Sequence, residues 1–261
     1  MPKSVFTPSR LPRRSLRLAA ARALDLLIPP VCLACQEPIA DHNSLCASCW
    51  HKISFITQPL CDRLGIPLPF DHGGETMLSA AAMARPPPYD RARAVAHYSD
   101  VIRNLIHQFK YGDQHTPRHL FSRWLQQAAV EFTDTKPLII PVPLHRIRLI
   151  ARRFNQSAIL ARDLAKATAL DYEPMALVRR RRTVSQVGLT RDQRRRNLQG
   201  AFTVTRRAAA RVSGRAIVLV DDVITTGTTV AMCARALKRA GASRIDVIAL
   251  AMVTDESRIN L

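Results

Sequence analysis

The amino-acid sequence predicts an α/β protein, in which a parallel β-sheet with crossover helices follows a small metal-binding module. Three observations support this fold class. Strand-like apolar runs alternate with amphipathic segments from about residue 92 onward, and four cysteines form two Cys-x2-Cys pairs before that point. The chain has 261 residues and is 47% hydrophobic, which is enough to bury at least one full core in one or two domains.

The expected strands and helices follow one another in order. Short apolar runs are interpreted as strands, and segments whose apolar residues recur every three to four positions as helices. Gly241 marks the end of the last helix. The expected strands are residues 94–98, 137–143, 215–220 and 245–253, and the expected helices are residues 101–111, 120–132, 155–169 and 229–240. We detect no internal repeat.

Four of the six cysteines have the spacing Cys32-x2-Cys35-x10-Cys46-x2-Cys49. Two such pairs can deliver four thiolates tetrahedrally to one zinc ion, and a closed set of four protein ligands is typical of a structural site. The zinc would then supply folding energy that a short, core-poor segment lacks. The other interpretation is that these are ordinary reduced cysteines.

Cys61 stands apart from this set. A third Cys-x2-Cys pair would need a cysteine at position 64, where the sequence has Leu64. Cys61 is therefore either the remnant of a degenerate half-site or a packed or free thiol. Residues 62–89 are interpreted as a loop-rich connection that ends in three prolines, so residues 26–90 form the zinc module with a Pro-rich linker and residues 91–261 form the α/β domain.

The charge is strongly basic, with 39 Lys and Arg against 20 Asp and Glu and a net charge of +19. Such an excess favours phosphate-rich partners: nucleic acid, nucleotides or phosphosugars. Residues 1–25 are expected to be a flexible basic tail that runs into a short helix. Arg17 and Arg22 interrupt its apolar stretch before a signal peptide can form, and no apolar run has the roughly 18 residues of a membrane span. A cytoplasmic location is therefore expected.

The run VLVDDVITTGTT, residues 218–229, carries the most specific chemistry. An apolar strand ends in Asp221 and Asp222, and the following threonine loop opens a helix, where backbone N–H groups and hydroxyls can bind a phosphate. It is neither a P-loop nor a dinucleotide fingerprint. The acidic pair can accept hydrogen bonds from ribose hydroxyls while the loop holds the 5′-phosphate. The expected loop contacts are Val223, Thr225, Thr226, Gly227, Thr228 and Thr229. The alternative is a buried strand with a solvated acidic turn.

This run resembles the motif that binds phosphoribosyl pyrophosphate (PRPP) in type I phosphoribosyltransferases. The segments PVPLHRIRLIARRFNQ (141–156), SQVGLTRDQRRRNLQGAF (185–202) and LIHQFKYGD (105–113), together with the four cysteines, are similar to the ComF family of competence-associated proteins. The resemblance implies a type I phosphoribosyltransferase-like domain, PRPP bound with Mg²⁺, structural Zn²⁺, and a role in handling single-stranded DNA with a helicase-like partner. Two departures are Arg153, where the family usually has glycine, and Leu64.

Basic residues cluster in two of these segments. The resemblance places a pyrophosphate loop at residues 143–156, where Asn155 could orient the loop or cap the next helix. Eight arginines between residues 179 and 196 resemble the family's active-site hood, but could equally track single-stranded DNA or form a solvated surface. The expected contacts to pyrophosphate or nucleic acid are Lys110, Arg148, Arg152, Arg153, Asn155, Gln156, Arg194, Arg195 and Arg196.

Two classes of function follow from the sequence. In the first, the protein is a phosphoribosyltransferase in which Asp221 and Asp222 are the catalytic residues and the acceptor is unassigned. In the second, it is a non-catalytic module that senses a nucleotide or binds single-stranded DNA with the same fold. No residue of the motif is an obvious base for an acceptor, which keeps the second class open.

Overall fold

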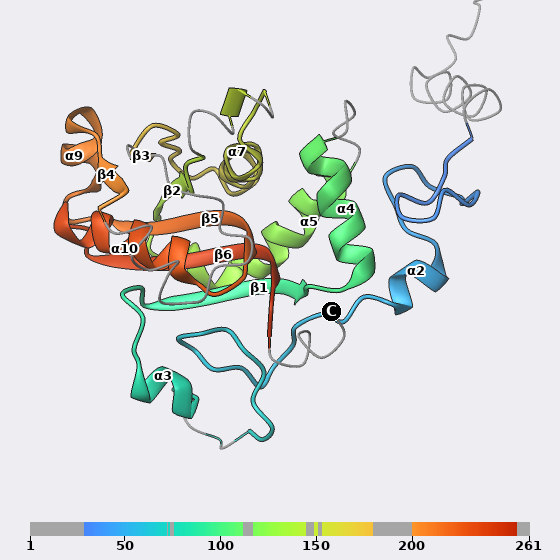
Figure 1. Ribbon diagram of the computed structural model, residues 1–261, viewed down its shortest axis with the longest axis horizontal. Coiled ribbons are helices and arrows are strands. Elements are labelled where there is room, and N and C mark those ends of the chain that lie inside the picture. The colour runs from blue at the N-terminus through green and yellow to red at the C-terminus, as the bar shows by residue number, and fades with distance from the viewer. Residues whose placement is uncertain are drawn as a thin grey trace, which may run out of the picture.

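The structure of the protein is a computed structural model that describes residues 29–71, 73, 76–111, 117–144, 149–150, 153–179 and 200–254. Its centre is a four-stranded parallel sheet with the order β1-β6-β5-β2 (Figure 1). The strands are β1 (Arg91–His97), β2 (Leu138–Pro141), β5 (Ala216–Ile224) and β6 (Arg244–Met252). The expected basic tail and its helix lie outside the described residues.

Helices cover both faces of this sheet. Alternate side chains of β5 enter two separate cores, Val218 and Val220 in one and Ile217 and Leu219 in the other, which is why the strand is apolar without interruption. The first face carries α4 (Asp100–Tyr111), α5 (Arg118–Ala129), η1 (Val130–Phe132) and α7 (Gln156–Thr168). The second carries α10 (Thr228–Arg239), α9 (Arg206–Val212) and a hairpin of β3 (Leu177–Arg179) with β4 (Phe202–Val204), gathered to the left in Figure 1.

The expected elements are present, and several boundaries differ. Strand β1 begins at Arg91, three residues earlier than expected, and β2 ends at Pro141, two residues earlier. Strand β5 does not end at Val220, because Asp221 and Val223 continue the ladder with β6 opposite Ala249 and Ala251. The acidic pair therefore belongs to the strand itself. The helix expected at residues 120–132 is α5 followed by one turn of 3₁₀-helix. The β3–β4 hairpin was not predicted, since each strand has only three residues.

The N-terminal module adds a strand-like segment to the free edge of β1. Residues 54–56 run antiparallel to the strand: the His97 N–H donates to the Ser54 carbonyl at 2.9 Å, and the Ile56 N–H donates to the Val95 carbonyl at 3.0 Å. Just before them, α2 (Ala47–His51) carries Trp50, whose ring lies 6.1 Å from that of Trp124 on α5. The module is thus packed on the sheet and the helix layer.

Residues 59–84 are not an irregular connection. They form a hairpin and a short helix, α3 (Ala80–Ala84), that repeat the backbone hydrogen bonds of residues 30–51. The expectation that the chain has no internal repeat was therefore wrong. The repeat escaped detection because its two copies share a backbone pattern and few side chains.

Candidate functional site

The candidate site lies between the carboxyl ends of β2 and β5. The connection that leaves β2 passes through α7 on one face of the sheet, whereas the one that leaves β5 enters α10 on the other face. Neighbouring parallel strands whose connections diverge in this way open a crevice at their carboxyl ends, where ligands of α/β proteins bind. Asp221, Asp222 and the threonine loop of residues 225–229 lie at this point.

Asp221 is the most buried acid of this site. Its Oδ1 accepts hydrogen bonds from the Ser157 hydroxyl at 3.0 Å and from the Asp222 backbone N–H at 2.9 Å. The pKa of Asp221 is raised to about 7, mainly by burial and further by the neighbouring Asp222 carboxylate. The two hydrogen bonds lower this pKa but do not offset the burial. Near neutral pH the site can therefore hold this carboxyl in either protonation state.

Asp222 is paired with a lysine from another element. The Nζ atom of Lys110, in the last turn of α4, lies 2.7 Å from Asp222 Oδ2, and both side chains are largely buried. The Gln156 side chain holds this helix end in place, because its Nε2 donates to the Lys110 carbonyl at 3.3 Å. The predicted contact residue Lys110 thus lies directly beside the predicted catalytic acid Asp222.

The threonine loop has the geometry of an anion site. Gly227 is the N-cap of α10 with a left-handed φ of +69°, and a side chain there would be strained even though the nearest atom to an added Cβ, the Tyr89 hydroxyl, is 3.9 Å away. The Thr226 and Thr228 hydroxyls lie 2.9 Å apart. Because no side chain caps the helix, its first N–H groups face the loop and are available to a phosphate. Val223 is half-buried in the sheet, Thr225 is exposed, and Thr229 is half-buried.

The loop after β2 supplies the other side of the crevice. Asn155 is the N-cap of α7, but its side chain makes no capping bond; its Nδ2 donates to the Val142 carbonyl at 3.0 Å. We expected Asn155 either to orient the loop or to cap the helix. Its side chain contacts the backbone at the start of the loop and does not cap α7. Arg153 is exposed and has a left-handed φ of +63°, the conformation that glycine adopts most readily. The loop thus keeps a backbone suited to glycine while carrying an arginine.

Several predicted contacts cannot be placed. Arg148, Arg152, Arg194, Arg195 and Arg196 lie outside the described residues, as do Arg191 and residues 180–182 of the arginine-rich segment. Arg179, the first of that segment, is buried at the end of β3 with its guanidinium 5.5 Å from the centre of the Phe202 ring.

Sequence reasoning missed Ser157. It stands two residues after Asn155 and faces Asp221 from the first turn of α7. The available signal was its place in the run FNQS at the start of a helix, where a small hydroxyl residue can bond a neighbouring acid.

The four predicted zinc ligands converge in the N-terminal module. The sulfur atoms of Cys32, Cys35, Cys46 and Cys49 all lie within 4.8 Å of one another. Tetrahedral zinc with bonds of about 2.3 Å places sulfur atoms about 3.8 Å apart, so the cluster fits one ion. Burial raises the pKa of Cys32, but hydrogen bonds from the backbone of Cys35 and Cys46 outweigh it and lower the pKa to about 6. The pKa values of Cys35 and Cys49 are raised instead, that of Cys49 by burial and by the neighbouring thiols. Zinc binding would therefore release protons from this cluster.

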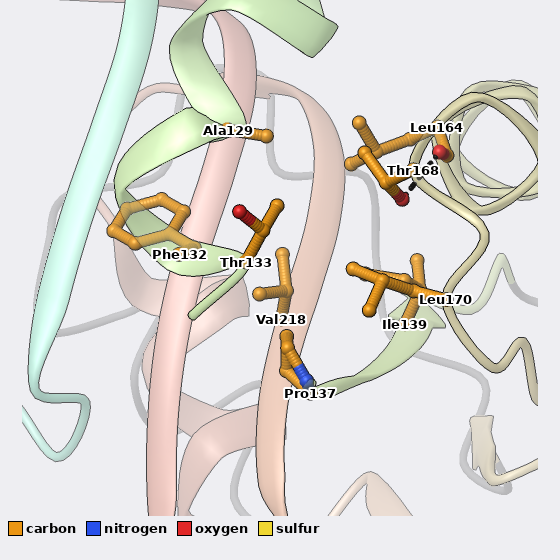
Figure 2. A pocket seen from close by; sticks show the side chains of 9 residues that line it. All are labelled: Ala129, Phe132, Thr133, Pro137, Ile139, Leu164, Thr168, Leu170 and Val218. Atoms are coloured by element: carbon orange, nitrogen blue, oxygen red, sulfur yellow. Dashed lines mark hydrogen bonds between the residues drawn. The ribbon is translucent and has the colours of Figure 1, made fainter. Parts of the chain in front are cut away.

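A second hollow lies at the opposite end of the strands. It is lined by Val218, Ile139 and the last residues of α5 and α7, is almost entirely apolar, and is too small to admit a water molecule (Figure 2). The Thr168 hydroxyl in its wall already donates to the Leu164 carbonyl. We interpret this hollow as imperfect packing between helices and sheet. No helix in the described part of the chain has the length and hydrophobicity of a membrane span.

The fold and the two sites define a class of protein. Residues 155–258 match the family described as the phosphoribosyl transferase domain, and residues 23–82 match the double zinc ribbon domain. The protein is therefore a phosphoribosyltransferase-like α/β domain joined to a zinc ribbon module. The cysteine cluster and the match together support a structural zinc ion.

Full-length relatives identify the family. The chain is 34% identical to the DNA utilization protein YhgH of Escherichia coli O157:H7 over 228 residues, which cover 85% of this chain and 96% of that protein. Competence protein F of Haemophilus influenzae is 29% identical, over 84% of this chain and 96% of that one. Competence protein ComFC of Bacillus subtilis is 24% identical, over 81% and 90%. The chain belongs to the family of DNA utilization protein YhgH and competence protein F, as its motifs predicted.

Two solved structures are similar to part of the chain. The purine phosphoribosyltransferase of Pyrococcus horikoshii Ot3 is 17% identical over 51% of this chain and 71% of that one, with a TM-score of 0.32. The glutamine phosphoribosylpyrophosphate amidotransferase of B. subtilis is 22% identical over 54% and 30%, with a TM-score of 0.36.

Proposed function

We propose that the protein binds PRPP, together with Mg²⁺, in the crevice between β2 and β5, and that it does so as part of DNA uptake or DNA metabolism in the cytoplasm. The observation that carries the proposal is the position of an acidic pair near the end of β5, from which a short loop leads to an uncapped helix N-terminus. Phosphate suits the helix end and ribose hydroxyls suit the carboxylates, and a phosphoribosyl group presents both.

Each described residue has a defined task in this proposal. The loop of residues 225–229 binds the 5′-phosphate through backbone N–H groups and threonine hydroxyls. Asp222 accepts a ribose hydroxyl, and Lys110, which pairs with Asp222 at 2.7 Å, turns to the pyrophosphate when the ligand enters. Asp221 is held by Ser157 and fixes the position of the ribose side of the site.

The donor set also fits a magnesium ion. Carboxylate oxygens are ligands that Mg²⁺ prefers, usually with substrate phosphates and water completing its shell, and the two acids supply them here. When bound, the ion would neutralise charge on the pyrophosphate.

If the protein is a transferase, the bond between C1′ and the pyrophosphate oxygen breaks with its electron pair leaving on pyrophosphate, and a nucleophile forms the new bond at C1′. The chain's own part is to orient the ribose through Asp221 and Asp222 and to stabilise the cationic ring with their negative charge. The acceptor remains to be found by a screen that measures pyrophosphate release.

The direct test is calorimetric titration of the purified protein with PRPP and Mg²⁺. We expect saturable binding that weakens on the order of 100-fold in Asp221→Asn/Asp222→Asn, because two hydrogen bonds to charged groups are weakened. Asp134→Asn, an exposed acid in a turn far from the crevice, is the matched control and should bind as the wild type does. Equal PRPP affinity in all three proteins would refute the assignment of the site.

The pH dependence gives an independent check on Asp221. Its pKa in the folded protein is about 7 against an ordinary value of 3.8, so between these values the folded state binds more protons than the unfolded state, and stability falls as the pH rises. The groups that face it are Asp222, Lys110, Ser157 and Cys233. We expect the Asp221→Asn variant to lose less thermal stability than the wild type between pH 5 and pH 8. If both proteins lose the same thermal stability over this range, the pKa of Asp221 is not raised by its surroundings.

A second candidate function is single-stranded DNA binding, favoured by the net charge of +19 and by relatives named for DNA utilization and competence. Binding through phosphates should weaken steeply with salt, because it releases counterions. If the same chain binds DNA but not PRPP, and the acidic pair does not matter, the protein is a nucleic-acid adaptor built on this fold. A helicase-like partner would be sought by co-purification with the full chain.

A further inference from the structure

The N-terminal region contains two copies of one structural unit, which we call the first ribbon (residues 30–51) and the second ribbon (residues 59–84). Each copy begins with a small hairpin closed by an antiparallel bridge. The bridges are Val31–Pro38 and Leu60–Pro67, and the bonds inside them are Cys32 N–H to Glu37 O and Cys61 N–H to Ile66 O, both 2.8 Å. The hairpin turns are equally alike, since Gln36 and Gly65 have φ angles of +66° and +67°.

The second half of each ribbon corresponds just as closely. The Cys46 N–H donates to Cys32 Sγ at 3.3 Å, and the Ser79 N–H donates to Cys61 Sγ at 3.3 Å. Cys46 then caps α2 by accepting from the Cys49 N–H, and Ser79 caps α3 by accepting from the Ala82 N–H. The bonds therefore align residue by residue, and each zinc ligand of the first ribbon has a counterpart in the second.

Three of these four counterparts cannot bind zinc. Cys61 corresponds to Cys32. In place of Cys35, Cys46 and Cys49, the second ribbon has Leu64, Ser79 and Ala82, respectively. We propose that the second ribbon folds without metal, that the protein binds a single zinc ion, and that contacts with the sheet replace the second ion. The match to a double zinc ribbon thus describes the backbone of residues 23–82 and not the metal content of this chain.

Burial and hydrogen bonds inside the second ribbon take the place of zinc coordination. Cys61 is fully buried and Ala82 is nearly so. The Cys61 sulfur accepts a hydrogen bond from the Ser79 N–H. In the first ribbon the equivalent N–H, that of Cys46, donates to the sulfur of Cys32. This backbone donor therefore has a sulfur acceptor in both ribbons. Among the described residues of the second ribbon, no buried side-chain nitrogen or oxygen atom is left without a hydrogen bond.

The sheet holds the second ribbon from outside. Arg93 of β1 is buried and donates to the Asp62 carbonyl at 2.8 Å and to Asp62 Oδ1 at 3.2 Å, while its Nε lies 2.6 Å from Glu131 Oε1. The hairpin tip lies directly against the same strand: a Cβ added to Gly65 would be 2.2 Å from the Ala92 carbonyl oxygen. The tip of the first ribbon, Gln36, is exposed. The first ribbon is instead contacted by the helix layer, where Arg123 of α5 donates to the Asn43 carbonyl at 3.0 Å. Contacts with β1 therefore hold the second ribbon, which keeps only one cysteine.

The experiment is to count zinc ions per chain by native mass spectrometry of the full-length protein. We expect one ion in the wild type, one in Cys61→Ser and none in Cys46→Ser. The variant Leu64→Cys/Ser79→Cys/Ala82→Cys, which restores the missing ligands, should bind two, because the backbone already places these positions as the first ribbon places its own.

Two results would overturn the proposal. A wild type with two ions, falling to one in Cys61→Ser, would show that the second ribbon is a metal site. A folded triple-cysteine variant that still binds one ion would show that the ligand geometry is not conserved. If the triple variant does not fold, the counts for the wild type and Cys61→Ser still decide the question. As a further measurement, removing zinc with a chelator should increase amide exchange in residues 30–51 and leave residues 59–84 protected.

Discussion

The first and second ribbons share a backbone and differ in what stabilises it. In the first, four thiols converge on a zinc position and the hairpin tip is exposed. In the second, one thiol remains, and β1 holds the hairpin through Arg93 and through close contact with Gly65. The comparison teaches that backbone hydrogen bonds define the ribbon, and that its stability can come from a metal ion or from a neighbouring sheet. Three substitutions test this contrast, and a fourth applies its backbone argument to the candidate site; they follow in order of decreasing effect.

The largest effect is expected from Cys46→Ser. A structural zinc site contributes on the order of 10 kcal/mol of folding free energy, so its loss should unfold the first ribbon while the second stays intact. The two tryptophans, Trp50 and Trp124, have ring centres 6.1 Å apart, and their fluorescence should therefore change. Unchanged fluorescence together with zinc loss would mean that packing alone holds this ribbon.

Arg93→Met should be the strongest substitution for the second ribbon. It removes a buried guanidinium from Asp62 and Glu131, whose side chains are 30% and 37% exposed. Breaking a buried ion pair costs roughly 3–5 kcal/mol, and the partial exposure of both acids puts the expected loss near the lower end. Chemical denaturation measures the loss, and zinc content should not change. Reduced zinc binding would show that the ribbons are energetically coupled.

Gly65→Ala should have a smaller but more specific effect. The left-handed φ costs roughly 1–3 kcal/mol for a residue with a side chain, and the added Cβ would force the hairpin away from Ala92. Gln36→Ala is the matched control, because that residue has the same φ, already carries a side chain and is exposed. We expect increased protease sensitivity of residues 59–84 for the first variant alone. If both variants become equally sensitive to protease, the effect comes from the turn itself and not from the contact between Gly65 and the sheet.

Arg153→Gly carries the same backbone argument to the candidate site and should have the smallest effect on stability. Relief of the left-handed conformation should stabilise the protein by about 1 kcal/mol, measured as a small rise in the melting temperature. PRPP affinity, measured by calorimetry, should fall if the guanidinium contacts pyrophosphate. The control Arg153→Asn, which tolerates a positive φ and also lacks the charge, separates the two effects. Unchanged affinity in both variants would leave Arg153 without a part in binding.

Much of the fold could be predicted because its signals are local. The apolar runs of β5 and β6 and the spacing of four cysteines were sufficient for the sheet and the first ribbon. Of the second ribbon, the sequence offered only Cys61 as the remnant of a half-site. The rest could not be recognised, because Leu64, Ser79 and Ala82 carry no metal-ligand pattern and hydrogen bonds between backbone groups leave little trace in side-chain identity. The end of β5 was misplaced because carboxylates usually end a strand, whereas Asp221 stays in the ladder opposite Ala249.

The candidate site could be predicted in its contiguous part only. The threonine loop and the acidic pair are neighbours in sequence, so their motif is visible directly. Ser157 reaches Asp221 from 64 positions away, and the strength of the Lys110–Asp222 pair depends on how two elements pack. Such contacts depend on tertiary geometry, which a single sequence does not display.

The position of β6 has a consequence for how the chain is made. This strand lies between β1 and β5, and it pairs Arg91 with Asp246, residues 155 positions apart. During synthesis from the N-terminus, both ribbons and β1 emerge well before the strand that joins β1 to the rest of the sheet. Until then one side of β1 exposes unpaired backbone groups, the kind of edge that promotes aggregation, while residues 54–56 can already cover the other side. A ribosome-bound chain that stops before residue 244 should therefore depend on chaperones.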